Sequence, residues 1–147
     1  MNKLVDTLQK KRVKVRKIPK WGVYLRKQWE DHFAGHLNEH EKSKIHLHDK
    51  GKSSGFLWHI FSFEKRECFT EKQADEVFNE VQKHACYVFY QHSNDALIIE
   101  NLSRITAEDF ENEQDIYVVD KDFAWTYVNT HENGWCGPYF SWKKENK

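Results

Sequence analysis

Two pairs of strand-like runs, each pair separated by a short polar turn, constrain the fold of this chain most. The runs CYVFYQH (86–92) and ALIIE (96–100) flank the tripeptide SND, and the runs at 116–119 and 123–130 flank DKD. Apolar and aromatic runs on both sides of turn-forming residues are typical of β-hairpins. Because hairpins join antiparallel strands, we expect a mainly antiparallel sheet.

Other segments carry helical signals. Large apolar side chains recur every four residues between positions 21 and 37, so they form one stripe on a helix. Helices are also predicted at 3–11 and after the N-capping residues Asn38, Thr70 and Thr106. The residues of the stripe are Trp21, Leu25, Trp29, Phe33 and Leu37.

Three further runs are predicted to be strands. The run 12–18 alternates basic and apolar residues, which is the pattern of a half-exposed edge strand. The run FLWHIFSF (56–63) is apolar on both alternating faces, the pattern of a central strand. A last short strand is predicted at 139–142.

The arrangement of these elements favours the α+β class. Hairpins, rather than a regular alternation of strands and helices, predict a mainly antiparallel sheet with helices packed on one face. The 147 residues are enough to bury one core, and no repeat or long linker divides them. We therefore expect a single compact domain spanning 1–147.

Composition disfavours several functional classes. Lys+Arg and Asp+Glu both number 23, a balance that gives no support to nucleic-acid binding. The longest apolar runs are too short to cross a bilayer, and the first residues lack the apolar segment of a secretory signal. The three cysteines, Cys68, Cys86 and Cys136, make no disulfide framework and suit a reducing compartment. A cytoplasmic protein is expected.

The stretch GWCGPYF (134–140) contains WCGP, the opening letters of the thioredoxin redox motif. Thioredoxin chemistry requires a second cysteine that resolves the mixed disulfide. Tyr139 occupies that position here. The stretch is therefore predicted to be a turn and not a redox centre.

His32, His36 and His40 are spaced by four residues, as metal ligands on a helix often are. The helix boundary predicted at Asn38 spoils that register, and no glutamate follows His32 in the HExxH manner. The three histidines are only weak candidates. Neither a metal site nor another cofactor is predicted.

Three other histidines lie in or near predicted strands: His59, His92 and His131, the last followed by Glu132. If the strand ends converge, these four residues would form an acid–base or metal site of a hydrolase-like or metal-dependent enzyme. The simpler interpretation is a hydrogen-bonded core histidine and a solvated hairpin tip. The enzyme hypothesis is kept as the alternative function.

Aromatic residues make up 15% of the chain, and most of them lie in strand-like runs that favour a packed core. An exposed subset would instead bind a protein, because Trp and Tyr anchor interfaces and acidic groups steer basic partners. The predicted contact residues are Trp58, Tyr90, Asp120, Asp122, Trp125 and Tyr127.

Several blocks of the sequence carry a resemblance to a known family. IPKWGVYLRKQWEDHFAGHL, GFLWHIFSFEKRECF, CYVFYQHSNDALIIEN and the segment from DIYVVDKDFAWTYVNTHE to GWCGPYF are similar to small Bacillus-type proteins catalogued as a domain of unknown function. The resemblance covers nearly the whole chain. It implies a compact single-domain bacterial protein and brings no catalytic residues.

A looser resemblance concerns the hairpin DIYVVDKDFAWTYVNTHE alone, which looks like the last hairpin of small bacterial immunity and antitoxin-like proteins. That resemblance implies an α+β scaffold that binds and neutralises a toxin. The expected function is therefore a non-enzymatic, immunity-like protein-binding module in the cytoplasm.

Overall fold

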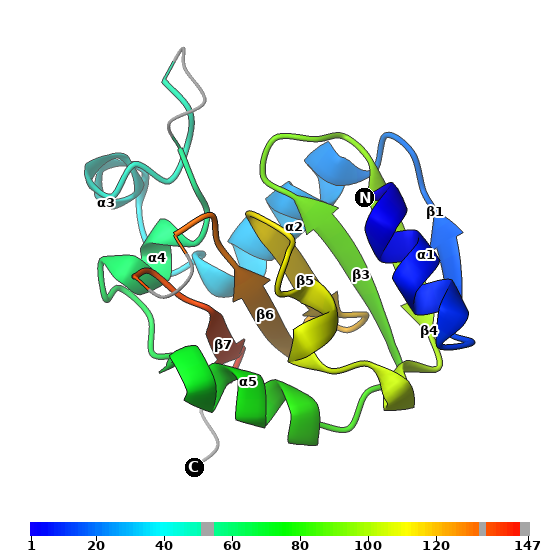
Figure 1. The fold of residues 1–147 in the computed structure, drawn as a ribbon. Helices are drawn as coiled ribbons and strands as arrows, with labels where there is room; N and C mark the ends of the chain where they lie inside the picture. The colour runs from blue at the N-terminus through cyan, green and yellow to red at the C-terminus, as the bar shows by residue number, and fades with distance from the viewer. Residues whose placement is uncertain (51–54, 133–134, 145–147) are drawn as a thin grey trace.

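The computed structural model describes residues 1–50, 55–132 and 135–144. Seven strands in this part of the chain form one sheet in the order β1-β4-β3-β5-β6-β7-β2 (Figure 1). Every neighbouring pair of strands is antiparallel. The elements in chain order are α1 (Asn2–Lys10), β1 (Lys14–Lys17), α2 (Gly22–Phe33), α3 (Glu39–Lys44), α4 (His59–Ser62), β2 (Phe69–Thr70), α5 (Glu71–Glu80), β3 (Ala85–Tyr90), β4 (Ala96–Glu100), the 3₁₀ helices η1 (Leu102–Arg104) and η2 (Ala107–Phe110), β5 (Ile116–Asp120), β6 (Trp125–Asn129) and β7 (Tyr139–Trp142).

The predicted α+β class with an antiparallel sheet is confirmed. Both predicted hairpins form, with Val88 of β3 opposite Leu97 of β4 and Val118 of β5 opposite Tyr127 of β6. The predicted edge strand is β1, which pairs only with β4, and the predicted last strand is β7. Strong local signals, namely apolar runs around a polar turn, account for this agreement.

Helices cover both faces of the sheet, so the prediction of helices on one face is wrong. Along β3, Val88 packs in a core with α1 and α5, whereas Phe89 packs in a second core with α2 and α4. Residues Val118 and Tyr117 of β5 alternate in the same way. We call these the α1/α5 face and the α2/α4 face; Figure 1 shows α1 and α5 on one side of the sheet and α2 on the other. Because the central strands are apolar on both sides, helices must cover both faces of the sheet.

The segment 56–63 is not a strand, contrary to the prediction. Its backbone N–H groups bond within the segment, as from Phe63 to the carbonyl of His59, and form α4. Ile60 and Phe61 are buried on the α2/α4 face. A short apolar run has no period that separates a buried strand from a short buried helix, which explains the error.

The predicted helix 21–37 ends earlier, because α2 stops at Phe33. The capping signal after it is confirmed. The Asn38 side chain accepts from the Glu41 N–H at 2.8 Å, and the Glu41 carboxylate accepts from the Asn38 N–H at 3.0 Å. A new helix, α3, therefore starts at this point.

The other two capping signals have different outcomes. Thr106 and Asp109 form a capping box around η2, as the predicted short helix requires. The helix predicted after Thr70 also forms, as α5, but the Thr70 side chain makes no capping hydrogen bond. Thr70 instead pairs with Tyr139 as the last residue of β2.

Within the described residues, no helix has the length and the apolar character needed to cross a membrane.

Candidate functional site

Three histidines from distant parts of the chain converge on one aromatic ring. The centroid of the Phe56 ring lies 5.4 Å from that of His59, 5.3 Å from that of His92 and 5.0 Å from that of His131. We call these three histidines and Phe56 the histidine cluster. The three histidines of the alternative hypothesis therefore contact the same ring.

The sheet topology explains why these residues meet. Strands β3 and β6 are both antiparallel to β5, which lies between them, so β3 and β6 run in the same direction and end at the same edge. His92 follows β3 and His131 follows β6. Strand β5 begins at this edge, which places Asp115, the residue before it, between the two histidines.

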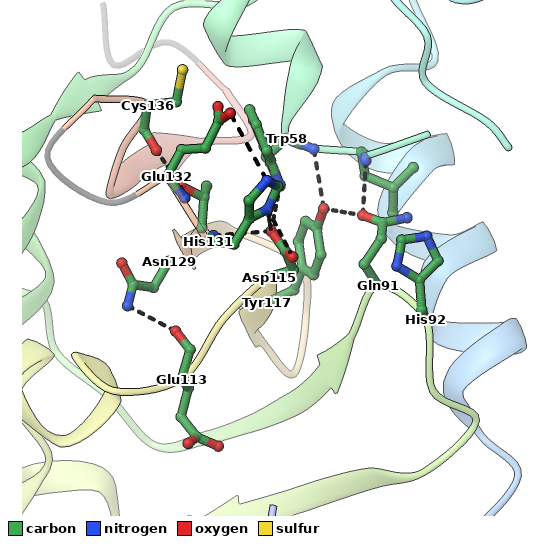
Figure 2. A network of polar contacts seen from close by, with 12 residues as sticks. Trp58, Gln91, His92, Glu113, Asp115, Tyr117, Asn129, His131, Glu132 and Cys136 are labelled. Atoms are coloured by element: carbon green, nitrogen blue, oxygen red, sulfur yellow. Dashed lines mark hydrogen bonds and ion pairs between the residues drawn. The ribbon is translucent and has the colours of Figure 1, made fainter. Parts of the chain in front are cut away.

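Asp115 holds His131 in a defined orientation (Figure 2). Its carboxylate oxygens lie 2.9 and 3.0 Å from Nδ1 of His131, and Oδ1 also accepts from the His131 backbone N–H at 3.2 Å. The Trp58 indole N–H donates to the same oxygen at 2.9 Å. Nε2 of His131 lies 3.9 Å from Oε1 of Glu132. A carboxylate that holds Nδ1–H leaves Nε2 as a proton acceptor, the arrangement of a general base.

Buried hydrogen bonds next to the histidine cluster position the segment that carries Phe56. The Tyr117 hydroxyl donates to the Gln91 side-chain oxygen and accepts from the Trp58 backbone N–H at 3.1 Å. The same Gln91 oxygen accepts from the Leu57 N–H at 2.9 Å. Burial raises the pKa of the Tyr117 hydroxyl well above its ordinary value, so the hydroxyl stays neutral. These bonds fix the segment that carries Phe56 against the edge of the sheet.

His92 lies between two open cavities. One, of about 490 Å³, is lined by Glu30, His48 and Asp49 among others, and the other, of about 340 Å³, includes Asp115 in its wall. Nε2 of His92 lies 3.3 Å from Oδ1 of Asp49. Both volumes fall at the lower end of the range for small-molecule sites.

Two exposed aromatic side chains belong to the same region. The Phe63 ring lies 5.5 Å from His59 and is 46% exposed. Trp135 is 87% exposed and lies in the loop that carries His131. Together with the histidine cluster, Phe63 and Trp135 form what we call the histidine–aromatic surface.

The structure does not bring together the weak metal candidates His32, His36 and His40. His32 stacks on Phe123 at 4.5 Å, and its pKa is lowered by burial and by the charge of Lys143. Nε2 of His36 bonds the Lys65 carbonyl at 2.8 Å, while His40 lies on α3. Among the described residues, no group of three His, Cys, Asp or Glu side chains is arranged to hold a metal ion.

Half of the predicted protein-contact residues are interior. Trp58, Trp125 and Tyr127 are buried, so their rings offer no surface to a partner. Trp125 and Tyr127 of β6 pack in the core of the α1/α5 face and Trp58 packs in that of the α2/α4 face; both faces are covered, which is why these rings are not accessible. The half-buried Tyr90 donates its hydroxyl to Glu113.

The two predicted acidic contacts lie at the β5–β6 turn. The Asp120 carboxylate accepts from the backbone N–H groups of Asp122 at 3.2 Å and of Ala124 at 3.1 Å. Asp120 therefore stabilises the turn. Asp122 is exposed, but the turn lies at the end of the strands opposite His131.

The predicted turn in GWCGPYF is confirmed for its described part; Gly134 lies outside the described residues. The backbone N–H groups of Trp135 and Cys136 both donate to the Glu132 carbonyl, at 2.8 and 2.7 Å. Burial, together with the Glu132 carboxylate, raises the pKa of the Cys136 thiol. A thiol so placed favours the protonated form, unlike a redox-active thiolate.

Sequence reasoning missed four residues around the histidines. Phe56 contacts all three rings and Asp115 bonds His131, while Gln91 and Tyr117 hold the segment that carries Phe56. The available signal was position: Asp115 directly precedes a predicted strand, and Gln91 is the residue before the last one of another.

A family model described as Domain of unknown function (DUF4275) matches residues 2–140. No curated protein and no solved structure matches the chain.

Proposed function

The chain belongs to the DUF4275 family, and we propose that it is a protein-binding module that uses the histidine–aromatic surface. The observation that carries the proposal is the 87% exposure of Trp135, whose backbone N–H donates to the carbonyl of Glu132, the residue after His131. Trp is enriched at the energetic centres of protein interfaces. Phe63 supplies a second exposed ring in the same region.

Charge suggests the chemistry of the partner. The side chains of Asp49 and Glu132 are 44% and 45% exposed, and each lies beside a histidine of the cluster. Acidic groups around an aromatic centre attract a basic partner and speed its association. We propose that the partner is a basic protein and that the role of this chain is immunity-like. The proposed location is a bacterial cytoplasm, where three free cysteines stay reduced.

The test compares two exposed aromatic residues. Complexes are recovered from the native host and measured by native mass spectrometry for the wild type, Trp135→Ala and Tyr24→Ala. Tyr24 lies on α2 and is 55% exposed, so it is a matched control outside the histidine–aromatic surface. We expect a partner of fixed stoichiometry whose affinity falls at least tenfold with Trp135→Ala and less than twofold with Tyr24→Ala. Equal effects of the two variants would contradict the proposal.

A second candidate function is acid–base catalysis at His131. It is favoured by the contact of Asp115 with Nδ1, which leaves Nε2 to take a proton from a water or hydroxyl. A hydrolase-like enzyme of this kind loses activity with His131→Gln and keeps it with Trp135→Ala. Hydrolysis of ester and phosphoester test substrates by the three proteins separates this function from binding alone. No hydrolysis by the wild type, or hydrolysis unchanged in His131→Gln, counts against it.

A further inference from the structure

A separate cavity lies at the opposite end of the sheet from the histidine cluster. It measures about 570 Å³ and is formed where α1 ends, where β3 begins and where β4 passes into η1. His84 of its wall precedes β3, whereas His92 of the histidine cluster follows β3. The cavity therefore shares no residue with the histidine–aromatic surface.

The lining of this cavity is cationic. Arg12, Lys83 and Arg104 contribute three positive charges from three different segments, and His84 adds a group that is charged when protonated. Within the described residues, no carboxylate lines the cavity. The chain as a whole has a formal net charge of zero, so the local excess is not a consequence of overall composition.

Two carboxylates from elements that adjoin the cavity are engaged in other ion pairs. Asp109 pairs with Lys11 at 2.8 Å, and Glu100 pairs with Lys14 at 3.4 Å. Among the described residues, no ion pair neutralises any of the three cations of the cavity.

The cations retain donors for a ligand. Nη1 of Arg104 makes one hydrogen bond, to the Lys11 carbonyl, at the long distance of 3.5 Å. Nζ of Lys83 lies 3.3 Å from the Val81 carbonyl, 3.4 Å from the Asn79 carbonyl and 4.7 Å from the centre of the Phe78 ring; these contacts fix its position and leave its charge unpaired. Guanidinium groups present several N–H donors in a plane and bind phosphate oxygens in pairs.

We propose that this cavity binds the phosphate group of a phosphorylated small molecule. Arg12 and Arg104 hold the phosphate oxygens, Lys83 supplies a third charge, and the side chains of Asn101 and Ser103 in the same wall bond the remaining polar atoms. The volume exceeds that of a single phosphate, so an organic portion of the ligand also fits.

The experiment is isothermal titration calorimetry with pyrophosphate as the probe, at constant ionic strength with chloride as the reference anion. The variants are Arg12→Gln and Arg104→Gln, each with its near-UV circular dichroism compared with the wild type. Arg16→Gln is the matched control, because Arg16 is an exposed cation of β1 outside the cavity. We expect each cavity variant to weaken binding at least fivefold and the control to change it less than twofold.

Three results would overturn the proposal. The first is no pyrophosphate binding above the chloride reference, and the second is an equal loss of affinity in Arg16→Gln. The third is binding of the protein to vesicles that contain phosphatidylglycerol without binding of pyrophosphate. That result would assign the cationic cavity to a membrane surface instead. None of these results depends on the histidine–aromatic surface, so they do not bear on the protein-binding function.

Discussion

Phe78, on the α1/α5 face, packs against Phe110, Trp125 and Tyr127 with ring centroids 5.9, 5.7 and 4.6 Å away. Trp29, on the α2/α4 face, is equally buried but donates its indole N–H to the Thr126 hydroxyl at 2.8 Å. Apolar packing therefore dominates at the centre of one face, whereas the other face also contains specific hydrogen bonds.

The difference extends to charged groups. On the α2/α4 side, the buried Lys42 and Glu30 form an ion pair at 2.8 Å, and His48 reaches the same carboxylate at 2.6 Å. These bonds connect α2 to α3 and to the loop after it, in a region with little regular structure. Directional bonds fix irregular segments that apolar packing alone positions less uniquely. The histidine cluster lies at the edge of this bonded face.

The largest effect is expected from Phe78→Ala on the α1/α5 face. Removal of a fully buried ring leaves a cavity, which lowers the free energy of unfolding by about 3–5 kcal/mol. Urea unfolding followed by fluorescence measures it. Phe69→Ala, at a ring that is 39% exposed, is the control and should cost much less. A similar loss in both variants would mean that Phe78 does not anchor this core.

A smaller effect is expected from Tyr117→Phe on the α2/α4 face. The ring stays, but the Trp58 N–H loses its acceptor and Gln91 loses a donor in a buried place. Unpaired buried groups cost about 1–3 kcal/mol. Because these bonds hold Phe56, NMR signals of His59, His92 and His131 should shift as well; unchanged histidine signals would show that the cluster does not depend on this hydroxyl.

The matched variant on the other face is Tyr127→Phe. Its hydroxyl donates to Asp75 at 2.7 Å, and Asp75 on α5 is only partly buried, so water replaces the lost donor. The expected loss in urea unfolding is about 0.5–1 kcal/mol. The comparison between the faces fails if Tyr127→Phe costs as much as Tyr117→Phe.

The last prediction concerns the buried Glu30 and the dependence of stability on pH. Burial alone raises its pKa, but hydrogen bonds from Lys42 and His48 outweigh this and lower the pKa below its ordinary value. The contribution of these bonds to the free energy of unfolding is therefore fully present above the ordinary glutamate pKa of about 4.3. It is lost as the pH falls through the lowered pKa of the folded state. Urea midpoints between pH 6 and pH 2.5 should fall less steeply in Glu30→Gln than in the wild type. Parallel curves would contradict the assignment.

Much of the sheet could be predicted because its signals are local. The two hairpins need only a turn between apolar runs, and the Asn38–Glu41 capping box spans four residues. The segment 56–63 failed because its burial depends on a distant sheet face, not on its own period. The histidines could be named as candidates, but their partner Asp115 could not, since the contact depends on how β3, β5 and β6 lie side by side.

The strand order also governs how the chain is assembled during synthesis. The pairs β3–β4, β5–β6 and β6–β7 join consecutive strands, whereas β1 pairs with β4, with Lys14 opposite Glu100. Strand β1 therefore leaves the ribosome well before β4, with which it pairs, has been synthesised, and non-local pairing of this kind forms slowly. During that interval the basic side chains of Lys14, Arg16 and Lys17 repel other nascent chains that carry the same strand. The charge that marks β1 as an edge strand thus also protects the unfinished protein from aggregation.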